Sequence, residues 1–208
     1  MNTFIKYFAA ALILGCLCSA CEKDYFIDGG KADGNFDGTV WEYLRSSRGN
    51  WDSLVVAIEH AGLTDVFDNP NAPVTLFGPK NHSINQFLFK TVDENGNRLY
   101  ESVKDIPADL CRRMVLSYVI EGVKMRTDFD YEVKGTLDGG TLLQTLSGAE
   151  LRVFRRKTDY GTIPDAGAEE LYIHAKKSGH IVLIVSGDIR PTNGVVHALS
   201  TTHQWTEF

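Results

Sequence analysis

The stretch Asp188-Ile-Arg-Pro-Thr-Asn-Gly-Val-Val-His-Ala-Leu-Ser200 is the part of the sequence that says most about the fold. It follows residues 181–185, an apolar and mostly β-branched run that predicts a strand buried on both faces. It then leads into a second predicted strand whose alternate residues share one face: Val195, His197 and Leu199. We therefore expect two neighbouring strands with a tight connection between them.

The residues of this connection suit a reversal of the chain. Pro191 fixes its own φ and lacks an N–H donor, while Asn193 and Gly194 form the pair that most readily tolerates positive φ. Buried polar groups need partners, so we expect His197 to hydrogen-bond the loop over residues 188–194; a role as a base or ligand is the alternative.

Helical patterns dominate the first half of the chain. Thr39-Val-Trp-Glu42 has the spacing of a capping box, which predicts the start of a short helix. A second helix is indicated by apolar residues at helical spacing, which end at Gly62, a residue suited to a helix C-terminus: Leu54, Ala57, Ile58 and Ala61.

A predicted strand and helix follow. Val74-Thr-Leu-Phe77 suits a strand that Gly78-Pro79 ends, and Asn81 is placed to cap a helix with three apolar residues on it: Ile84, Phe87 and Leu88.

The next predicted helix begins near Asp105-Ile-Pro-Ala-Asp109 and ends at Gly122. Its apolar side carries Leu110, Met114, Val115 and Tyr118. Cys111 lies in this helix, and we expect it to be a small buried residue rather than a nucleophile. It is the one cysteine beyond residue 21, so no disulfide framework is expected.

Strand patterns and turns fill the second half, and residues 157–169 form a polar, glycine-bearing segment that predicts a surface loop. Helices in the first half and strands in the second indicate an α+β fold.

The motifs in this order resemble the fasciclin domain family. The stretch at 188–200 is similar to the family's C-terminal signature, and residues 72–87 are similar to its N-terminal signature, with Gly78 and Ile84 where alanine is common. The resemblance implies one fasciclin-like α+β domain over residues 36–208. Its helices would lie mostly in the N-terminal half and pack on a β-sandwich or wedge built mostly from the C-terminal half.

The resemblance also implies candidate binding residues: Asp188, Ile189 and Tyr118. Asp188-Ile189 match an Asp-Ile pair to which integrin contact is assigned in animal members of the family, but Asp188 is equally suited to accept loop amides. Tyr118 matches the tyrosine of a Tyr-His pair, while Val119 stands in place of the histidine. The structural motif residues are Asn81, Asn193, Gly194 and His197.

No catalytic motif stands out, and we expect neither catalysis, a cofactor nor a metal. Residues 93–97, Asp-Glu-Asn-Gly-Asn, superficially resemble a calcium loop, but Arg98 and Lys104 occupy positions where that loop needs Gly and Glu. The formal net charge of −6, with no basic run, argues against nucleic acid as a partner.

The N-terminus predicts a lipoprotein. Residues 7–17 read as a signal-peptide core, and Leu17-Cys-Ser-Ala-Cys21 resembles a bacterial lipobox. We expect a signal peptide over residues 1–20, lipidation of Cys21 and a flexible tether over residues 21–35. A competing lipobox ends at Cys16, and an ordinary cleaved signal peptide is the third possibility.

These observations predict a function for the whole chain. We expect a lipid-anchored module of the bacterial outer membrane, at the cell surface, that binds a protein or glycan ligand through surface loops. The membrane would be contacted through the lipid alone. The alternative is a structural or accessory component of an outer-membrane lipoprotein complex, such as one for nutrient uptake.

Overall fold

The computed structural model describes residues 34–208. The predicted signal peptide, Cys21 and the predicted tether up to residue 33 lie outside the described residues.

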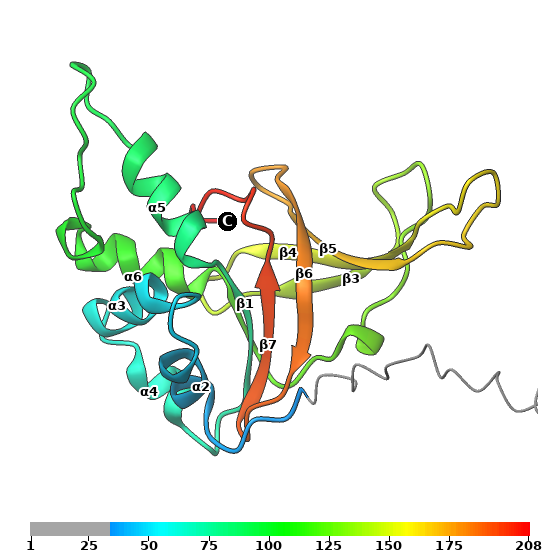
Figure 1. The fold of residues 1–208 in the computed structure, drawn as a ribbon, viewed down its shortest axis with the longest axis horizontal. Coiled ribbons are helices and arrows are strands. Elements are labelled where there is room, and N and C mark those ends of the chain that lie inside the picture. The colour runs from blue at the N-terminus through cyan, green and yellow to red at the C-terminus, as the bar shows by residue number, and fades with distance from the viewer. Residues whose placement is uncertain (1–33) are drawn as a thin grey trace, which may run out of the picture. The chain divides into compact units, whose positions relative to one another are not determined.

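The helices lie together on one side of a β-sheet (Figure 1). The capping box between Thr39 and Glu42 is confirmed, and Gly62 has a φ of 63° just beyond the second helix. Burial raises the pKa of the Cys111 thiol to about 11, as expected for a buried cysteine. The helices are α2 (Val40–Ser46), α3 (Asp52–His60), α4 (Thr64–Asp68), α5 (Asn81–Lys90) and α6 (Ala108–Leu116), with 3₁₀ turns η1 (Val103–Asp105) and η2 (Arg126–Asp128).

Seven strands form one sheet in the order β2-β1-β7-β6-β5-β4-β3. Neighbouring strands are antiparallel except β1 and β7, which are parallel. The predicted α+β fold is thus confirmed. The strands are β1 (Val74–Gly78), β2 (Val119–Glu121), β3 (Thr141–Gln144), β4 (Glu150–Lys157), β5 (Glu169–Ala175), β6 (Ile181–Ile189) and β7 (Gly194–Leu199).

The sheet bends until its two edges approach each other. The N–H of Leu146, just after β3, donates to the carbonyl of Val119 in β2 at 2.8 Å. The bend passes through β6, whose register with β7 shifts on both sides of Ser186. The first part of β6 pairs with β5 and the later part with β7, so the sheet turns where β6 changes partner.

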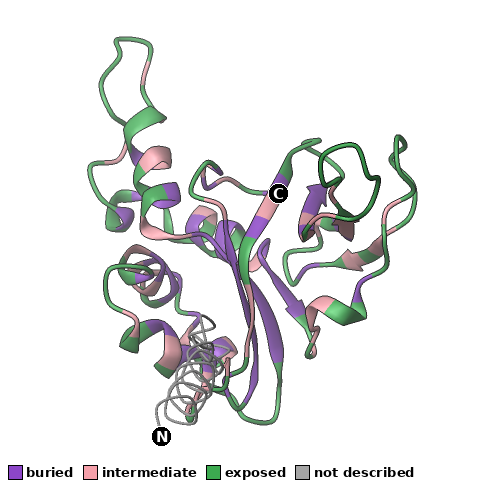
Figure 2. Ribbon diagram, turned by 45° about the vertical axis from the view of Figure 1, so that its right-hand side comes forward, coloured by how far each residue is buried: buried purple, intermediate pink, exposed green. Residues whose placement is uncertain are grey.

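The prediction that residues 181–185 are buried on both faces is wrong. Ile181 and Val185 are 49% and 48% exposed, whereas Val182 and Ile184 are buried. The apolar run does not distinguish a two-sided strand from a one-sided one, because apolar side chains also occupy solvated faces. The strands buried along their whole length are instead β1 and β7, and Figure 2 shows buried strands in purple in the middle of the domain.

The connection from β6 to β7 reverses by a different means from the one expected. Among the described residues, Asp188 has a positive φ of 59°, while neither Asn193 nor Gly194 does. Gly194 is needed for space: a Cβ there would lie 2.2 Å from the carbonyl oxygen of Val74. The close parallel approach of β1 and β7 therefore accounts for this glycine.

The helix expected to end at Gly122 ends at Leu116. Residues 119–121 form β2, which pairs with β1, and Gly122 adopts its φ of 83° directly after that strand. Hydrogen bonding to β1 and the β-branched Val119 and Ile120 favour a strand over the local helical pattern.

The expected capping role of Asn81 is also wrong. Lys80 is the N-cap of α5 and makes no side-chain cap. The Asn81 side chain instead accepts the Ser53 N–H at 2.8 Å and donates to the Asp52 carboxylate at 2.9 Å. The Asn81 side chain thus supplies hydrogen-bond partners to the first turn of α3, a helix distant in sequence.

Asn193 joins the β6–β7 connection to two helices. Its side-chain oxygen accepts the Val40 N–H at 2.7 Å, and its amide nitrogen donates to the carbonyls of Phe67 at 3.0 Å and Asn69 at 3.1 Å. Since Asn193 is only 1% exposed, water does not compete for these groups. The side chain therefore fixes α2 and α4 against the sheet.

We predict that Asn193→Ala lowers the free energy of unfolding by about 2–4 kcal/mol, because it removes the side-chain hydrogen bonds to one N–H and two carbonyls. Urea unfolding followed by circular dichroism measures the change. The matched control is Asn71→Ala at an exposed position, expected to change stability by less than about 0.5 kcal/mol. Equal losses in the two variants would contradict the role assigned to Asn193.

Candidate functional site

Asp188 and Ile189, the predicted contact pair, lie half-buried at the end of β6. The Asp188 carboxylate accepts the backbone N–H of Arg126 at 2.7 Å, so it holds the segment around η2. Ile189 packs against the hydrophobic core. Both residues therefore have structural partners, and their role as a contact site stays a prediction.

His197 is fully buried behind this loop. Its Nε2 donates to the carbonyl of Lys124 at 2.9 Å, and its Nδ1 accepts the N–H of Asp188 at 3.3 Å. These bonds require the neutral ring protonated on Nε2. Burial lowers the pKa of His197, which favours the same neutral form. Both ring nitrogens are thus engaged by backbone groups.

Tyr118, the third predicted binding residue, lies in the core with 1% of its surface exposed. Its hydroxyl is hydrogen-bonded to Nε2 of His203 at 2.7 Å and to the carbonyl of Thr206 at 2.8 Å, and its ring centroid lies 4.3 Å from that of Phe208. Burial raises the pKa of Tyr118 and lowers that of His203 to about 4. Tyr118 therefore fastens the C-terminal segment to the body of the domain.

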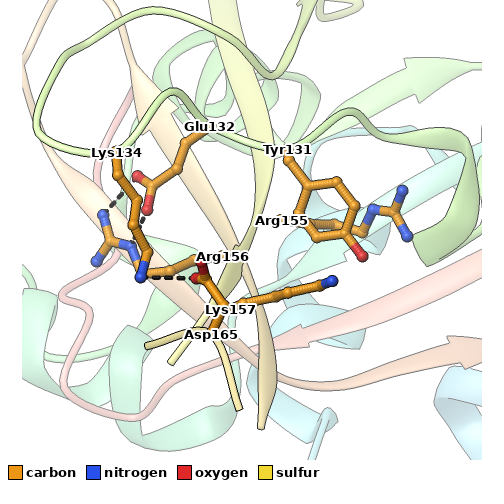
Figure 3. Close-up of a pocket in the computed structure, with 7 residues that line it drawn as sticks. All are labelled: Tyr131, Glu132, Lys134, Arg155, Arg156, Lys157 and Asp165. Atoms are coloured by element: carbon orange, nitrogen blue, oxygen red, sulfur yellow. Dashed lines mark hydrogen bonds and ion pairs between the residues drawn. The ribbon is translucent and has the colours of Figure 1, made fainter. Parts of the chain in front are cut away.

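A charged hollow of about 180 Å³ lies elsewhere, between the loop over residues 130–140 and the end of β4. Figure 3 shows its side chains in two groups. One group consists of Glu132, Lys134, Arg156 and Asp165, and the other of Tyr131, Arg155 and Lys157. We call this place the charged hollow.

Ion pairs fix the first group. Arg156 donates from Nε and Nη2 to the two carboxylate oxygens of Glu132, at 2.5 and 2.8 Å, and these bonds lower the pKa of Glu132. Lys134 lies between Asp165 at 2.7 Å and Asp159 at 3.0 Å. The hydrogen bond to Asp165, followed by that to Asp159, raises the pKa of Lys134. The loops on both sides of the hollow are thus joined.

The second group fixes an aromatic ring. The hydroxyl of Tyr131 donates to Glu169 at 2.5 Å, and the Arg155 guanidinium carbon lies 4.1 Å from the ring centroid. Nζ of Lys157 lies 5.2 Å from the same centroid. Tyr131 is nevertheless 40% exposed, so part of a rigidly held ring faces solvent.

Sequence reasoning missed this hollow and predicted only the surface loop that borders it. The available signal was three consecutive basic residues, Arg155-Arg-Lys157, which are too few to form a basic run but stand out in a chain of net negative charge. Tyr131 and Arg155 are distant in the sequence and meet only through an isolated β-bridge, so no local sequence pattern predicts their contact.

Residues 34–208 contain no group of three or more His, Cys, Asp or Glu side chains placed to hold a metal ion. They also contain no helix long and apolar enough to cross a membrane.

The architecture defines a fasciclin-like α+β domain, and comparison with known proteins agrees. The family model for the fasciclin domain matches residues 49–202, so the chain belongs to the fasciclin domain family. Domains of this family are typically adhesion or binding modules.

A solved structure has a similar fold: the FAS1 domain pair of the insect cell adhesion molecule fasciclin I, with a TM-score of 0.55 and 15% sequence identity. The match covers 82% of this chain and 51% of that chain, so this chain spans about half of the domain pair. The likeness shows the shared fold. A comparison with curated proteins finds no match.

We predict that the domain loses stability as the pH falls from about 6.5 towards 4. The pKa of His203 is about 4 in the folded state, below its ordinary value of 6.5, so the unfolded chain binds the proton first. His203 alone then lowers the free energy of unfolding by about 2 kcal/mol between pH 7.5 and pH 5. Urea unfolding at several pH values measures the slope.

The control for this prediction replaces a different histidine. His203→Gln should flatten the slope, whereas His82→Gln, at an exposed position on α5, should leave it unchanged. An unaltered slope in His203→Gln would show that the buried ring is not the source.

Proposed function

We propose that this protein is a lipid-anchored adhesion or binding module of the bacterial cell envelope that contacts protein or carbohydrate through surface loops, without a catalytic step. The observation that carries the proposal is the set of exposed apolar and aromatic side chains on the two loops beside the charged hollow: Leu137, Tyr160 and Ile163. Exposed side chains of this kind, next to immobilised charges, suit a contact surface.

The buried reactive groups support binding over catalysis. Both ring nitrogens of His197 are hydrogen-bonded to backbone groups, and His203 is hydrogen-bonded to the hydroxyl of Tyr118. Cys111, with its pKa raised to about 11, is a thiol and not a thiolate at neutral pH. Each of these groups has a role in packing or hydrogen bonding that leaves it poorly suited to attack a substrate.

The entry of the chain into the domain favours these loops as the outward contact. The Arg190 N–H donates to the carbonyl of Gly34 at 2.6 Å, and the Phe36 N–H donates to the carbonyl of Arg190 at 3.0 Å. A lipid anchor preceding Gly34 therefore leads into the domain beside Asp188-Ile189. Arg126 lies between this point of entry and the charged hollow, since its N–H donates to Asp188 and its Nη1 donates to the carbonyl of Glu169 at 2.9 Å. The loops of the hollow are exposed at Leu137, Tyr160 and Ile163.

Protease treatment of intact cells tests the proposal. Loss of the domain from whole cells, detected with an antibody to the domain, supports a surface-exposed adhesion module. Survival of the domain until the outer membrane is opened contradicts surface exposure and favours the alternative, an accessory component of an outer-membrane lipoprotein complex.

We predict that Cys21→Ser moves the protein from the membrane fraction to the soluble fraction, since the lipid is the proposed attachment. Cell fractionation and incorporation of labelled palmitate measure the change. Cys16→Ser is the matched control because it removes the competing lipobox cysteine, and it should leave both readouts unchanged. The opposite pattern would assign the anchor to Cys16.

A further inference from the structure

We propose that the charged hollow is a binding subsite for one unit of an acidic saccharide, with the sugar ring against Tyr131 and its negative group near Lys157. This inference rests on the proposed function, a module that binds through its loops, and it specifies the ligand class and the place. Four observations carry it: a held aromatic ring, a cation without an ion pair among the described residues, a mixed set of hydrogen-bonding groups and the size of the hollow.

The aromatic ring is prepared before any ligand arrives. The bond from the Tyr131 hydroxyl to Glu169 and the stacking of Arg155 restrict the rotation of the side chain. Little conformational entropy then remains to be lost on binding. The electron-rich face of a tyrosine attracts positively polarised groups, and the axial C–H groups of a pyranose ring are of this kind.

The charges around the hollow leave one cation without a carboxylate. Glu132 pairs with Arg156, Asp159 and Asp165 pair with Lys134, and Glu169 pairs with Arg155. Lys157 forms no ion pair with any residue in the part of the chain that the structure describes. A ligand anion therefore meets a cation whose charge is not already neutralised.

The hydrogen-bonding groups of the hollow are both donors and acceptors. Arg156 and Lys134 donate, and the oxygens of Glu132 and Asp165 accept. Each carboxylate oxygen has more than one acceptor site, so these groups keep capacity after pairing with their cations. Sugar hydroxyls both donate and accept, which suits this mixed lining better than an apolar peptide side chain would.

The size of the hollow matches one unit of a polymer. Its volume of about 180 Å³ equals roughly six water molecules and lies below the 300–1,000 Å³ of a typical pocket for a whole small molecule. The exposed Tyr160 and Ile163 on the bordering loop extend the surface beyond the hollow. We therefore place one saccharide unit in it, with the chain continuing along the loops.

The experiment measures binding of the full chain, purified in detergent, to immobilised polygalacturonate and dextran sulfate. Methyl-esterified polygalacturonate keeps the sugar without its charge, and polyglutamate keeps the charge without the sugar. We expect saturable binding to at least one acidic polysaccharide and at least about tenfold weaker binding to the ester and to polyglutamate.

Paired variants locate the contact. Tyr131→Ala and Lys157→Met should each weaken binding about tenfold, whereas Tyr131→Phe, which keeps the ring but loses the hydrogen bond to Glu169, should weaken it clearly less. Phe89→Ala is the matched control because Phe89 is 70% exposed and also lies under an arginine, Arg98, at 4.8 Å. Lys177→Met is the matched control for Lys157→Met, because it removes an exposed lysine just beyond the other end of β5, and it should leave binding unchanged. Unchanged melting temperatures confirm that the variants are folded.

Several outcomes overturn the assignment. They are no saturable binding to either acidic polysaccharide, equal binding to polyglutamate, or equal loss in the control variants. Adhesion of whole cells to surfaces distinguishes this failure from failure of the proposed function. If adhesion depends on this protein but is unaffected by Tyr131→Ala, the proposed function stands and the subsite in the charged hollow is refuted. If adhesion does not depend on the protein, both proposals are refuted.

Discussion

The buried amide of Asn193 is the interaction on which the rest of the domain depends. It supplies one acceptor and two donors to backbone groups of α2 and of the segment ending α4, and the Asn193 side chain itself is shielded from water. An asparagine offers this combination of donors and acceptor in a short side chain, and an apolar residue offers none of it. The buried strand β7 begins at the next residue, so the same amide sets where the helical layer meets the sheet. His197, further along β7, likewise hydrogen-bonds two backbone groups, the carbonyl of Lys124 and the N–H of Asp188, and so holds the segment that leads into η2.

Those parts of the fold that depend on local chemistry could be predicted from the sequence. The capping box at Thr39 and Glu42 and the glycine ending α3 use residues that are neighbours in the chain. The errors occur where a distant partner decides. Residues 119–121 become β2 because β1 offers hydrogen bonds, and Asn81 serves Ser53 rather than its own helix. The conformation of Asp188 follows from the register shift in β6, which no local pattern reports.

The candidate site shows the same division. The residues of the family motif were identified individually, but their burial and hydrogen bonding needed the fold: Tyr118 lies beneath the C-terminal segment, far from any surface role that its motif suggests. The charged hollow combines residues from two loops and one strand. Its aromatic ring and guanidinium, Tyr131 and Arg155, meet through a bridge between separate segments. Only the cluster of basic residues at the end of β4 was visible in the sequence, and the carboxylate partners of Arg155 and Arg156, which are Glu169 and Glu132, come from elsewhere in the chain.

The parallel pairing of β1 with β7 has a kinetic consequence. Val74 in the first strand pairs with Gly194 in the last, about 120 positions later, so the centre of the sheet closes only when nearly the whole domain is present. Loop-closure entropy over such a separation opposes early formation of this contact. A chain emerging from the ribosome or from a translocation channel can assemble its helices, yet it lacks the strand that joins them to the sheet. Completion of the native domain thus coincides with the arrival of its last fifteen or so residues, and until then the apolar strands depend on other protection from aggregation.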